Sequence, residues 1–289
     1  MQIGVNVPNF GPGTDPDVLL RWARTVEALG FDLLMVSDHV VLTPDVAGKY
    51  PAPFYEPFTT LSWLAAVTSR IRLGTTVLIA PYRHPLLVAR MAANLSRLSG
   101  ERLVLGVGIG WARQEFHALH VPFERRGALT DELIEKVRHA WDDQADYRAG
   151  HVPIWVGGNS EAGLLRAVRL GDAWHPLRNS VSWLTDARDR LKATADELKC
   201  EAPAFAPRIA LRLTDAPVRR ADRLAGEGSI EQVVADLEQL RRLRADTVVL
   251  DPFNGDPAET LRPELAWQAL ATVAASQNLT AQSREPEDR

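Results

Sequence analysis

Cysteine is almost absent from this sequence: Cys200 is the single one among 289 residues. One thiol excludes an internal disulfide framework and is typical of a reducing compartment, so we expect a cytoplasmic protein. Long hydrophobic runs are also missing, and no signal peptide precedes Gly4. We therefore expect neither export nor a membrane partner.

Charge of one sign is not in excess either. The chain has 33 Lys and Arg residues against 37 Asp and Glu residues, a net charge of −4, and no basic stripe. Nucleic acid is therefore not an expected partner. The sequence also lacks an HExxH motif, a Cys/His cluster and a Ser/His/Asp set in a nucleophile elbow. We expect no metal site and no serine-hydrolase chemistry.

The sequence does contain a repeated alternation of short apolar runs and longer amphipathic stretches. Short apolar runs bounded by turn residues are typical of strands buried on both faces. The expected strands are Gln2–Val7, Phe31–Val36, Ile71–Ile79, Arg102–Gly106, Pro153–Val156, Ala173–Pro176, Pro207–Leu213 and Thr247–Leu250. The expected helices are Asp15–Leu29, Glu56–Arg70, His84–Leu98, Thr130–Trp141, Ala162–Leu170, Trp183–Lys199, Ile230–Leu243 and Leu261–Ala275, and a shorter one opens at Trp111–Phe116.

Strict β/α alternation over about eight units indicates a parallel sheet closed into a single (β/α)8 barrel, a TIM barrel, over residues 1–278. The alternative is an open Rossmann-type sheet. Against it, no GxGxxG motif follows the first expected strand, and Gly106–Gly110 comes too late with a different spacing. Residues 279–289 are polar, and we expect them to be disordered.

The candidate functional residues are those that directly follow the expected strands, because barrel active sites lie at the C-terminal ends of the strands. They are Asn6, Asp38, His39, Gly74–Thr76, Gly108, Gly110, Gly157–Ser160, Trp174, His175 and Asp251. Glycines allow a flat ligand to approach the backbone closely. A wall of glycine, hydroxyl, tryptophan and histidine residues is poorly equipped for hydrolysis and fits a planar, phosphate-bearing cofactor.

Several of these residues have two interpretations. Gly157–Ser160 joins a strand to a helix, and is either an anion site at the helix N-terminus or a tight turn with a cap. His39 either exchanges protons at a strand end or is a hydrogen-bonded structural residue. Glu115 faces either the barrel mouth or solvent. Thr75 and Thr76 either donate hydroxyls to a ligand or mark a bulge.

Six motifs occur in order along the first 176 residues. They are Leu29–Asp32 with Ser37–His39, Ile71–Thr75, Arg83–Pro85, Leu98–Gly100 and Gly106–Trp111 with Glu115–Phe116, Pro153–Gly158, and Gly171–Trp174. In this order they resemble the luciferase-like monooxygenase superfamily, and within it the F420-dependent oxidoreductase branch. No single motif is specific, so the resemblance depends on their order.

The resemblance implies a barrel whose strand ends hold coenzyme F420, a deazaflavin, or the flavin FMN. It places Asp38 and His39 beside the reactive ring and Gly157–Gly158 at the phosphate. His39 is the expected catalytic residue, either for proton exchange or for stabilising charge on the ring. The resemblance also implies a bulge with a non-proline cis peptide near Thr75–Val77. The full expected cofactor-binding set is Asn6, Asp38, His39, Thr75, Thr76, Val77, Gly108, Gly110, Gly157, Gly158, Asn159 and Ser160.

Two positions depart from the sugar-phosphate dehydrogenases of this family. Those enzymes carry a glutamate directly after the Gly-x-Gly turn, where this chain has Trp111. They also carry a tryptophan shortly after the Asp-His pair, which Val40–Pro44 lacks. A sugar phosphate is therefore not the expected substrate. The residues expected on the substrate side are Trp111, Trp174 and Glu115, with the loop Val40–Phe54.

The expected function is hydride transfer between F420 and an unsaturated or carbonyl-like small molecule, with Arg178 near the acidic tail of the cofactor. An FMN-dependent monooxygenase working with a separate flavin reductase is the alternative, because both cofactors use the same cleft. A cofactor-binding protein without turnover is a third interpretation. The resemblance also favours a homodimer.

Overall fold

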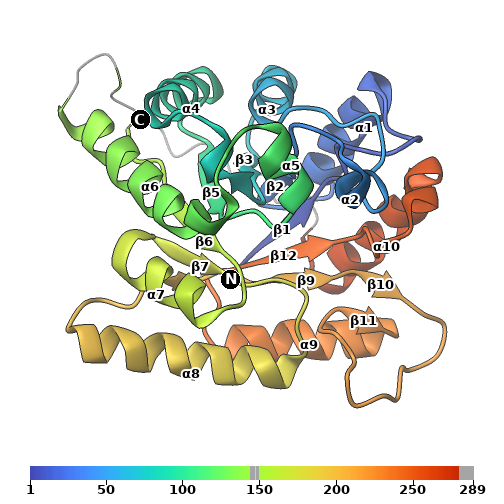
Figure 1. Ribbon diagram of the computed structural model, residues 1–289. Coiled ribbons are helices and arrows are strands. Elements are labelled where there is room, and N and C mark those ends of the chain that lie inside the picture. Colours follow the sequence, from blue (N-terminus) through green and yellow to red (C-terminus); the bar gives the residue numbers. More distant parts are fainter. Residues whose placement is uncertain (144–146, 148–149, 280–289) are drawn as a thin grey trace, which may run out of the picture.

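The structure is a computed structural model that describes residues 1–143, 147 and 150–279 (Figure 1). Residues 280–289 of the expected tail lie outside the described residues, as do five residues of the polar segment before the fifth expected strand. Within the described part of the chain, no helix is long and apolar enough to cross a membrane.

Parallel strands form the centre of the molecule. Following the chain, they are β1 (Gln2–Asn6), β2 (Leu33–Val36), β3 (Arg72–Thr75), β5 (Leu103–Gly108), β6 (Ile154–Gly157), β7 (Ala173–His175), β8 (Ala204–Phe205), β9 (Arg208–Ala210) and β12 (Thr247–Asp251). β8 pairs with β7, and β9 pairs with β12, which in turn pairs with β1. Because only Ala206 and Pro207 separate β8 from β9, these two short strands close the ring. The predicted (β/α)8 barrel is confirmed.

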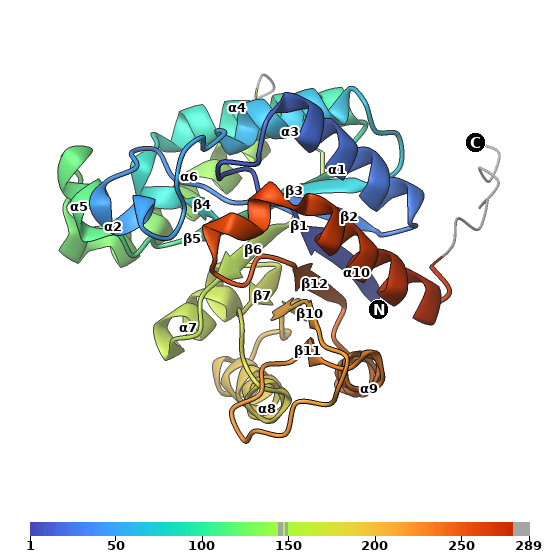
Figure 2. The same ribbon diagram turned by 90° about the vertical axis from the view of Figure 1, so that its right-hand side faces the viewer.

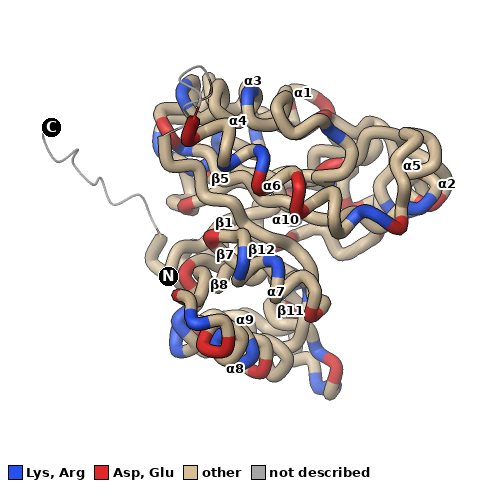
Figure 3. The backbone as a smooth tube through the Cα atoms, turned by 60° about the vertical axis from the view of Figure 1, so that its left-hand side comes forward, with Lys and Arg blue, Asp and Glu red and all other residues tan. Residues whose placement is uncertain are grey.

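Helices cover the outside of this ring (Figures 1 and 2). They are α1 (Pro16–Ala28), α2 (Pro44–Ala47), α3 (Pro57–Ala65), α4 (Pro85–Ser99), α5 (Arg113–Ala118), α6 (Arg126–Asp143), α7 (Glu161–Leu170), α8 (Val181–Leu198), α9 (Ile230–Arg242) and α10 (Pro263–Ser276). Many begin with a side-chain cap or a proline in the first turn, as at Asp15 and Ser160. Acidic and basic residues are mixed on these helices (Figure 3).

The apolar residues form two layers because alternate residues of a strand point to opposite faces. A small inner cluster inside the barrel includes Met35, Val104 and Trp155. A much larger cluster fills the space between strands and helices and includes Trp174. The second layer is the main core, since it joins the helices to the barrel wall.

The third expected strand is interrupted. It is divided into β3 and β4 (Leu78–Ile79), and the Thr76–Val77 peptide bond between them is cis. The bulge and the non-proline cis peptide implied near Thr75–Val77 are therefore confirmed.

Other boundaries differ from the expectation. Helix α6 begins at Arg126 rather than Thr130, because Gly127 weakens the helical pattern of its first turn. The loop after His39 contains the short helix α2. The seventh expected strand leads into β10 (Arg212–Leu213), which pairs with β11 (Glu227–Gly228) outside the barrel.

Candidate functional site

The C-terminal ends of β2, β3, β5, β6 and β7 open into a cleft of about 480 Å³, which Arg208 at the start of β9 also lines. Helices α2 and α5 lie side by side near this end of the barrel (Figure 2). The cleft brings together most of the residues that the sequence singled out. Those that line it are Asp38, His39, Thr76, Val77, Gly108, Gly110, Trp111, Gly157, Gly158, Asn159 and Ser160.

Val77 forms a ledge on the wall of the cleft, and two of the glycines make room for it. A Cβ on Gly108 would lie 2.5 Å from Val77 Cγ2, and one on Gly157 would lie 2.8 Å from Val77 Cγ1. Gly158 is different, because its φ of +117° favours glycine while a Cβ there would meet nothing within 4 Å. The result is a wall of backbone and one branched side chain, against which a flat ring fits.

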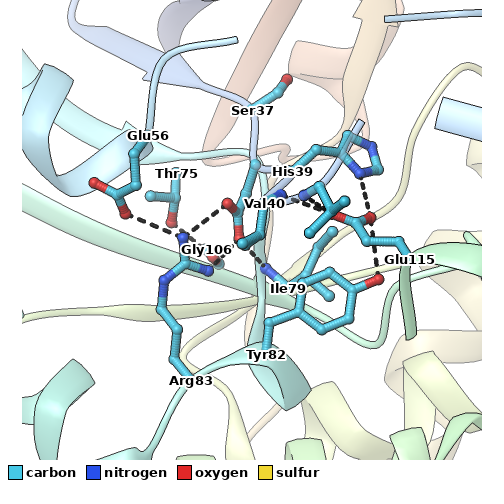
Figure 4. A network of polar contacts seen from close by, with 12 residues as sticks. Ser37, His39, Val40, Glu56, Thr75, Ile79, Tyr82, Arg83, Gly106 and Glu115 are labelled. Carbon is cyan, nitrogen blue, oxygen red and sulfur yellow. Dashed lines mark hydrogen bonds and ion pairs between the residues drawn. The ribbon is translucent and has the colours of Figure 1, made fainter. Parts of the chain in front are cut away.

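His39 stands at the edge of the cleft and is held by a carboxylate. Its Nδ1 lies 2.7 Å from Glu115 Oε2, and its side chain is largely buried (Figure 4). Three aromatic rings surround the imidazole, with centroid distances of 5.4 Å to Tyr50, 5.5 Å to Phe54 and 5.7 Å to Trp111. Within the described residues, His39 Nε2 has no hydrogen-bond partner.

Glu115 does not face the mouth or the solvent, and the expectation that it lines the substrate side is wrong. It is 0% exposed, because it lies in the first turn of α5 and points under the chain that leaves β2. Its Oε1 accepts from Val40 N at 2.6 Å and Val41 N at 3.1 Å, and its Oε2 accepts from Tyr82 Oη at 3.1 Å.

The surroundings of Glu115 determine its charge. Burial raises the pKa of this carboxyl, but the hydrogen bond and charge of His39 and the two backbone N–H bonds outweigh burial and lower the pKa overall. Burial and Glu115 raise the pKa of the Tyr82 hydroxyl, which therefore remains a donor. An ionised Glu115 favours the tautomer with the proton on His39 Nδ1, which leaves Nε2 with a free lone pair at the edge of the cleft.

Asp38 lines the cleft, but its carboxylate is bonded inside the protein. Arg83 donates to it through Nη1 at 2.6 Å and Nη2 at 2.9 Å, and Ile79 N donates at 2.9 Å (Figure 4). Arg83 also bonds Glu56 at 3.0 Å. This bidentate pair ties the end of β2 to the segment after β4, so Asp38 fixes the loop that carries His39.

The floor of the cleft is a chain of hydrogen bonds around Thr76. Arg208 Nη1 donates to Thr76 O at 2.9 Å and to Thr76 Oγ1 at 3.0 Å, and Thr76 Oγ1 lies 2.9 Å from His175 Nε2. His175 Nδ1 donates to the Ala206 carbonyl. Burial, helped by the charge of Arg208, lowers the pKa of His175 to about 4, so this imidazole is neutral at pH 7 and supports the wall.

Besides Glu115, three further residues expected in the site do not line this cleft. Trp174 is fully buried outside the barrel against Trp183 and Phe205, because it alternates with the inward-facing His175. Its expected place on the substrate side is therefore wrong, although its Nε1 bonds Gly158 O at 2.9 Å and so supports the turn. Thr75 is also fully buried and donates to Gly106 O at 2.7 Å. Asn6 lines an adjoining chamber.

The turn after β6 has its side chains occupied. Asn159 bonds the backbone of Leu177 twice, at 2.8 and 2.9 Å, and Ser160 Oγ accepts from Gly163 N. Within the described residues, the N–H groups of Glu161 and Ala162 have no acceptor, as is usual at a helix start. An anion bound here would therefore contact the backbone rather than these side chains.

Sequence reasoning missed Tyr50, Tyr82, Arg83 and Arg208. Tyr50 and Tyr82 lie in expected loops, and no local pattern marks them. Arg83 belongs to one of the ordered motifs but received no role. Arg208 could have been found, since an arginine inside a strand expected to be buried requires a partner.

The described part of the chain contains no candidate metal site. Across residues 1–143, 147 and 150–279, no group of three or more His, Cys, Asp or Glu residues could hold a metal ion.

Comparisons with known proteins agree with this architecture. Residues 1–217 match the family model described as luciferase-like monooxygenase. An uncharacterized protein of Mycobacterium tuberculosis is 32% identical over 224 residues, which cover 67% of this chain and 75% of that protein. An F420-dependent glucose-6-phosphate dehydrogenase of Intrasporangium calvum is 31% identical over 190 residues, covering 57% of this chain and 54% of the enzyme.

A solved structure has the same fold at low identity. The oxygenating constituent of 3,6-diketocamphane monooxygenase from Pseudomonas putida, a type II Baeyer-Villiger monooxygenase in complex with FMN, superposes with a TM-score of 0.73. It is 16% identical, and the match covers 95% of this chain and 97% of that one. With the family model matching most of its length, the chain belongs to the luciferase-like monooxygenase family.

Proposed function

We propose that this protein is an F420-dependent oxidoreductase that transfers a hydride between the deazaflavin and a small organic substrate. The observation that carries the proposal is the His39–Glu115 pair at the edge of a glycine-walled cleft. A histidine with one nitrogen fixed by a buried carboxylate and the other facing a cleft is equipped for proton exchange.

The residues present fit a cofactor of this kind. The cleft of about 480 Å³ is within the range of small-molecule and cofactor sites. The Val77 ledge and the glycines beside it offer a flat surface for a tricyclic ring. Arg126 lines the same cleft and supplies positive charge for an anionic cofactor.

Each residue has a role that follows from its contacts. When bound, the deazaflavin would supply or accept the hydride. His39 Nε2 would give a proton to the substrate or take one from it, while Glu115 stabilises the positive charge on the imidazole. The rings of Tyr50, Phe54 and Trp111 restrict water around His39. Asp38 and Arg83 hold the loop in place.

The alternative function is an FMN-dependent monooxygenase that receives reduced flavin from a separate flavin reductase. The glycine wall and the Val77 ledge would accept either tricyclic ring. The His39–Glu115 pair favours the deazaflavin reaction, because a hydride transfer to a carbonyl carbon needs a proton for its oxygen.

The test is a pair of equilibrium titrations of cofactor-free protein with F420 and with FMN, followed by fluorescence. We expect saturable binding of F420 at least about tenfold tighter than that of FMN, a difference of about 1.4 kcal/mol. Tighter binding of FMN would favour the monooxygenase. Binding of neither cofactor would reject both functions. F420 binding without a spectral change, either when an alcohol is added to the oxidised cofactor or when a ketone or alkene is added to the reduced cofactor, would favour a binding protein without turnover.

A further inference from the structure

A second chamber adjoins the cleft at the mouth of the barrel. It measures about 180 Å³ and lies at the C-terminal ends of β1 and β12, with Arg208 from the start of β9 in its wall. Ser37, Tyr50, Leu177 and Arg208 line both spaces, so the two are neighbours across these side chains. A molecule seated in the chamber would be separated from the His39 side of the cleft only by this shared wall.

Two arginines dominate the chamber. Arg178 Nη1 lies 3.3 Å from Asp251 Oδ2, and Arg208 Nε lies 3.4 Å from the same oxygen. The backbones of the two arginines are also joined, since Arg178 N donates to Arg208 O at 2.8 Å. Arg178 has a φ of +54°, which is uncommon for a residue other than glycine. The two guanidinium groups are therefore held together at one carboxylate oxygen.

Within the described residues, these arginines use only part of their N–H groups in hydrogen bonds. Arg178 Nη1 also donates to Phe253 O at 2.7 Å, and Arg208 Nη1 bonds Thr76. Within the described residues, the Nη2 group of each arginine has no hydrogen-bond partner, and Arg178 is 28% exposed. Both arginines line the chamber, and guanidinium N–H groups fit the planar oxygens of a carboxylate.

The charges of the lining favour an anionic ligand. Arg178 and Arg208 carry two positive charges and Asp251 carries one negative charge, so these three groups have a net charge of +1. A carboxylate neutralises the charge of these three groups. Lys49, exposed at the rim, adds attraction for an anion.

The rest of the wall is aromatic. Phe10 packs edge-on against Tyr50 and against Phe253, each at a centroid distance of 4.9 Å, and all three line the chamber. These rings offer an apolar surface for the body of a ligand whose charged head lies on the arginines.

We propose that this chamber anchors the substrate and that it takes a monocarboxylate with a short apolar or aromatic body. The proposal rests on the proposed function, and it adds the substrate class. The carboxylate lies on Arg178 and Arg208, and the reactive end of the substrate passes Tyr50 into the cleft toward His39.

Benzoate and its neutral isostere benzamide test the proposal. Each is titrated calorimetrically into the full chain without cofactor, at constant ionic strength. We expect benzoate to bind at least about tenfold more tightly than benzamide, and Arg178→Gln to weaken benzoate about ten- to hundredfold without affecting benzamide. Arg169→Gln removes the same charge from the exposed face of α7 and should change neither.

Lys49→Glu is a second variant that leaves the buried contacts intact, and it should weaken benzoate severalfold. Equal binding of benzoate and benzamide, or of benzoate to the wild type and Arg178→Gln, would overturn the proposal. So would a loss of F420 affinity in Arg178→Gln without a loss of benzoate, because the anion at Arg178 would then belong to the cofactor. Benzoate binding without F420 binding would retain the chamber and reject the proposed function.

Discussion

The two sides of the barrel mouth differ in how completely the protein itself pairs their charged side chains. On the side of β2 and α5, Glu115 accepts four hydrogen bonds and Asp38 accepts three, all from the protein. On the side of β9 and β12, Arg178 and Arg208 share the single carboxylate Asp251. Within the described residues, each of these arginines retains an Nη2 group without a hydrogen-bond partner.

We infer from this difference that the two sides of the mouth have different roles. Fully bonded carboxylates hold their neighbours rigidly and bind no ligand themselves, so the first side positions one imidazole beside the cleft. Guanidinium groups with free donors are equipped to bind an anion, so the second side selects the substrate.

The largest effect should come from His39, where the first side meets the cleft. His39→Gln keeps a polar side chain but removes the group that exchanges protons. Turnover should fall about 10²- to 10⁴-fold, the usual contribution of a general acid or base. Steady-state kinetics with a substrate found by screening carboxylate-bearing ketones and enones would measure it. His117→Gln, on the exposed face of α5, is the matched control, and equal turnover of the two variants would contradict the role of His39.

Glu115→Leu tests the rigidity of the first side. The change leaves the two backbone N–H groups, the Tyr82 hydroxyl and His39 Nδ1 without their acceptor in a buried place. The free energy of unfolding should fall by about 3–5 kcal/mol, measured by urea denaturation. Glu124→Leu, which removes an exposed glutamate paired with Arg113, should leave it nearly unchanged. Similar losses in both variants would show that the buried network adds little.

His175 lies where the two sides meet, and it predicts a pH dependence. Its pKa is about 4 in the folded protein, below the ordinary value of 6.5. Between these values the unfolded chain binds a proton that the folded chain does not, so folding stability declines as the pH falls from about 6.5 to 4. Above this range His175 has no effect on the pH slope.

The decline assigned to His175 should reach about 3 kcal/mol at pH 4. His175→Gln should therefore show a flatter fall in its free energy of unfolding between pH 6.5 and 4, by urea denaturation at each pH. His117→Gln serves as the control. Parallel curves for His175→Gln and the wild type would contradict the neutral state of the buried imidazole.

The barrel could be predicted from the sequence because its causes are local. Apolar runs, caps such as Asp15 and the glycines after each strand are all visible within a few residues, and each specifies a β/α unit. The cleft wall at Gly108, Gly157 and Gly158 was predicted for the same reason. These residues follow strands directly, and the fold places strand ends together.

The rest of the site depends on contacts between residues far apart in the sequence. His39 and Glu115 are separated by 76 positions, so no local pattern reveals that the carboxylate turns inward. Trp174 and His175 were both candidates, and only the side-chain alternation of the three-residue strand β7 decides which one points inward. Arg208 pairs across the barrel with Thr76, 132 positions away.

The most direct test of the central claim is F420 binding to a variant whose cleft is filled. Ile109 and Val77 both line the cleft, and Ile109→Trp would fill part of its space. Leu98→Trp makes a similar apolar-to-tryptophan change at a position that is 75% exposed. In parallel fluorescence titrations we predict that Ile109→Trp weakens F420 at least about tenfold, a change of about 1.4 kcal/mol, and that Leu98→Trp binds like the wild type. Unchanged F420 affinity in a folded Ile109→Trp variant would contradict the assignment of this cleft to the cofactor.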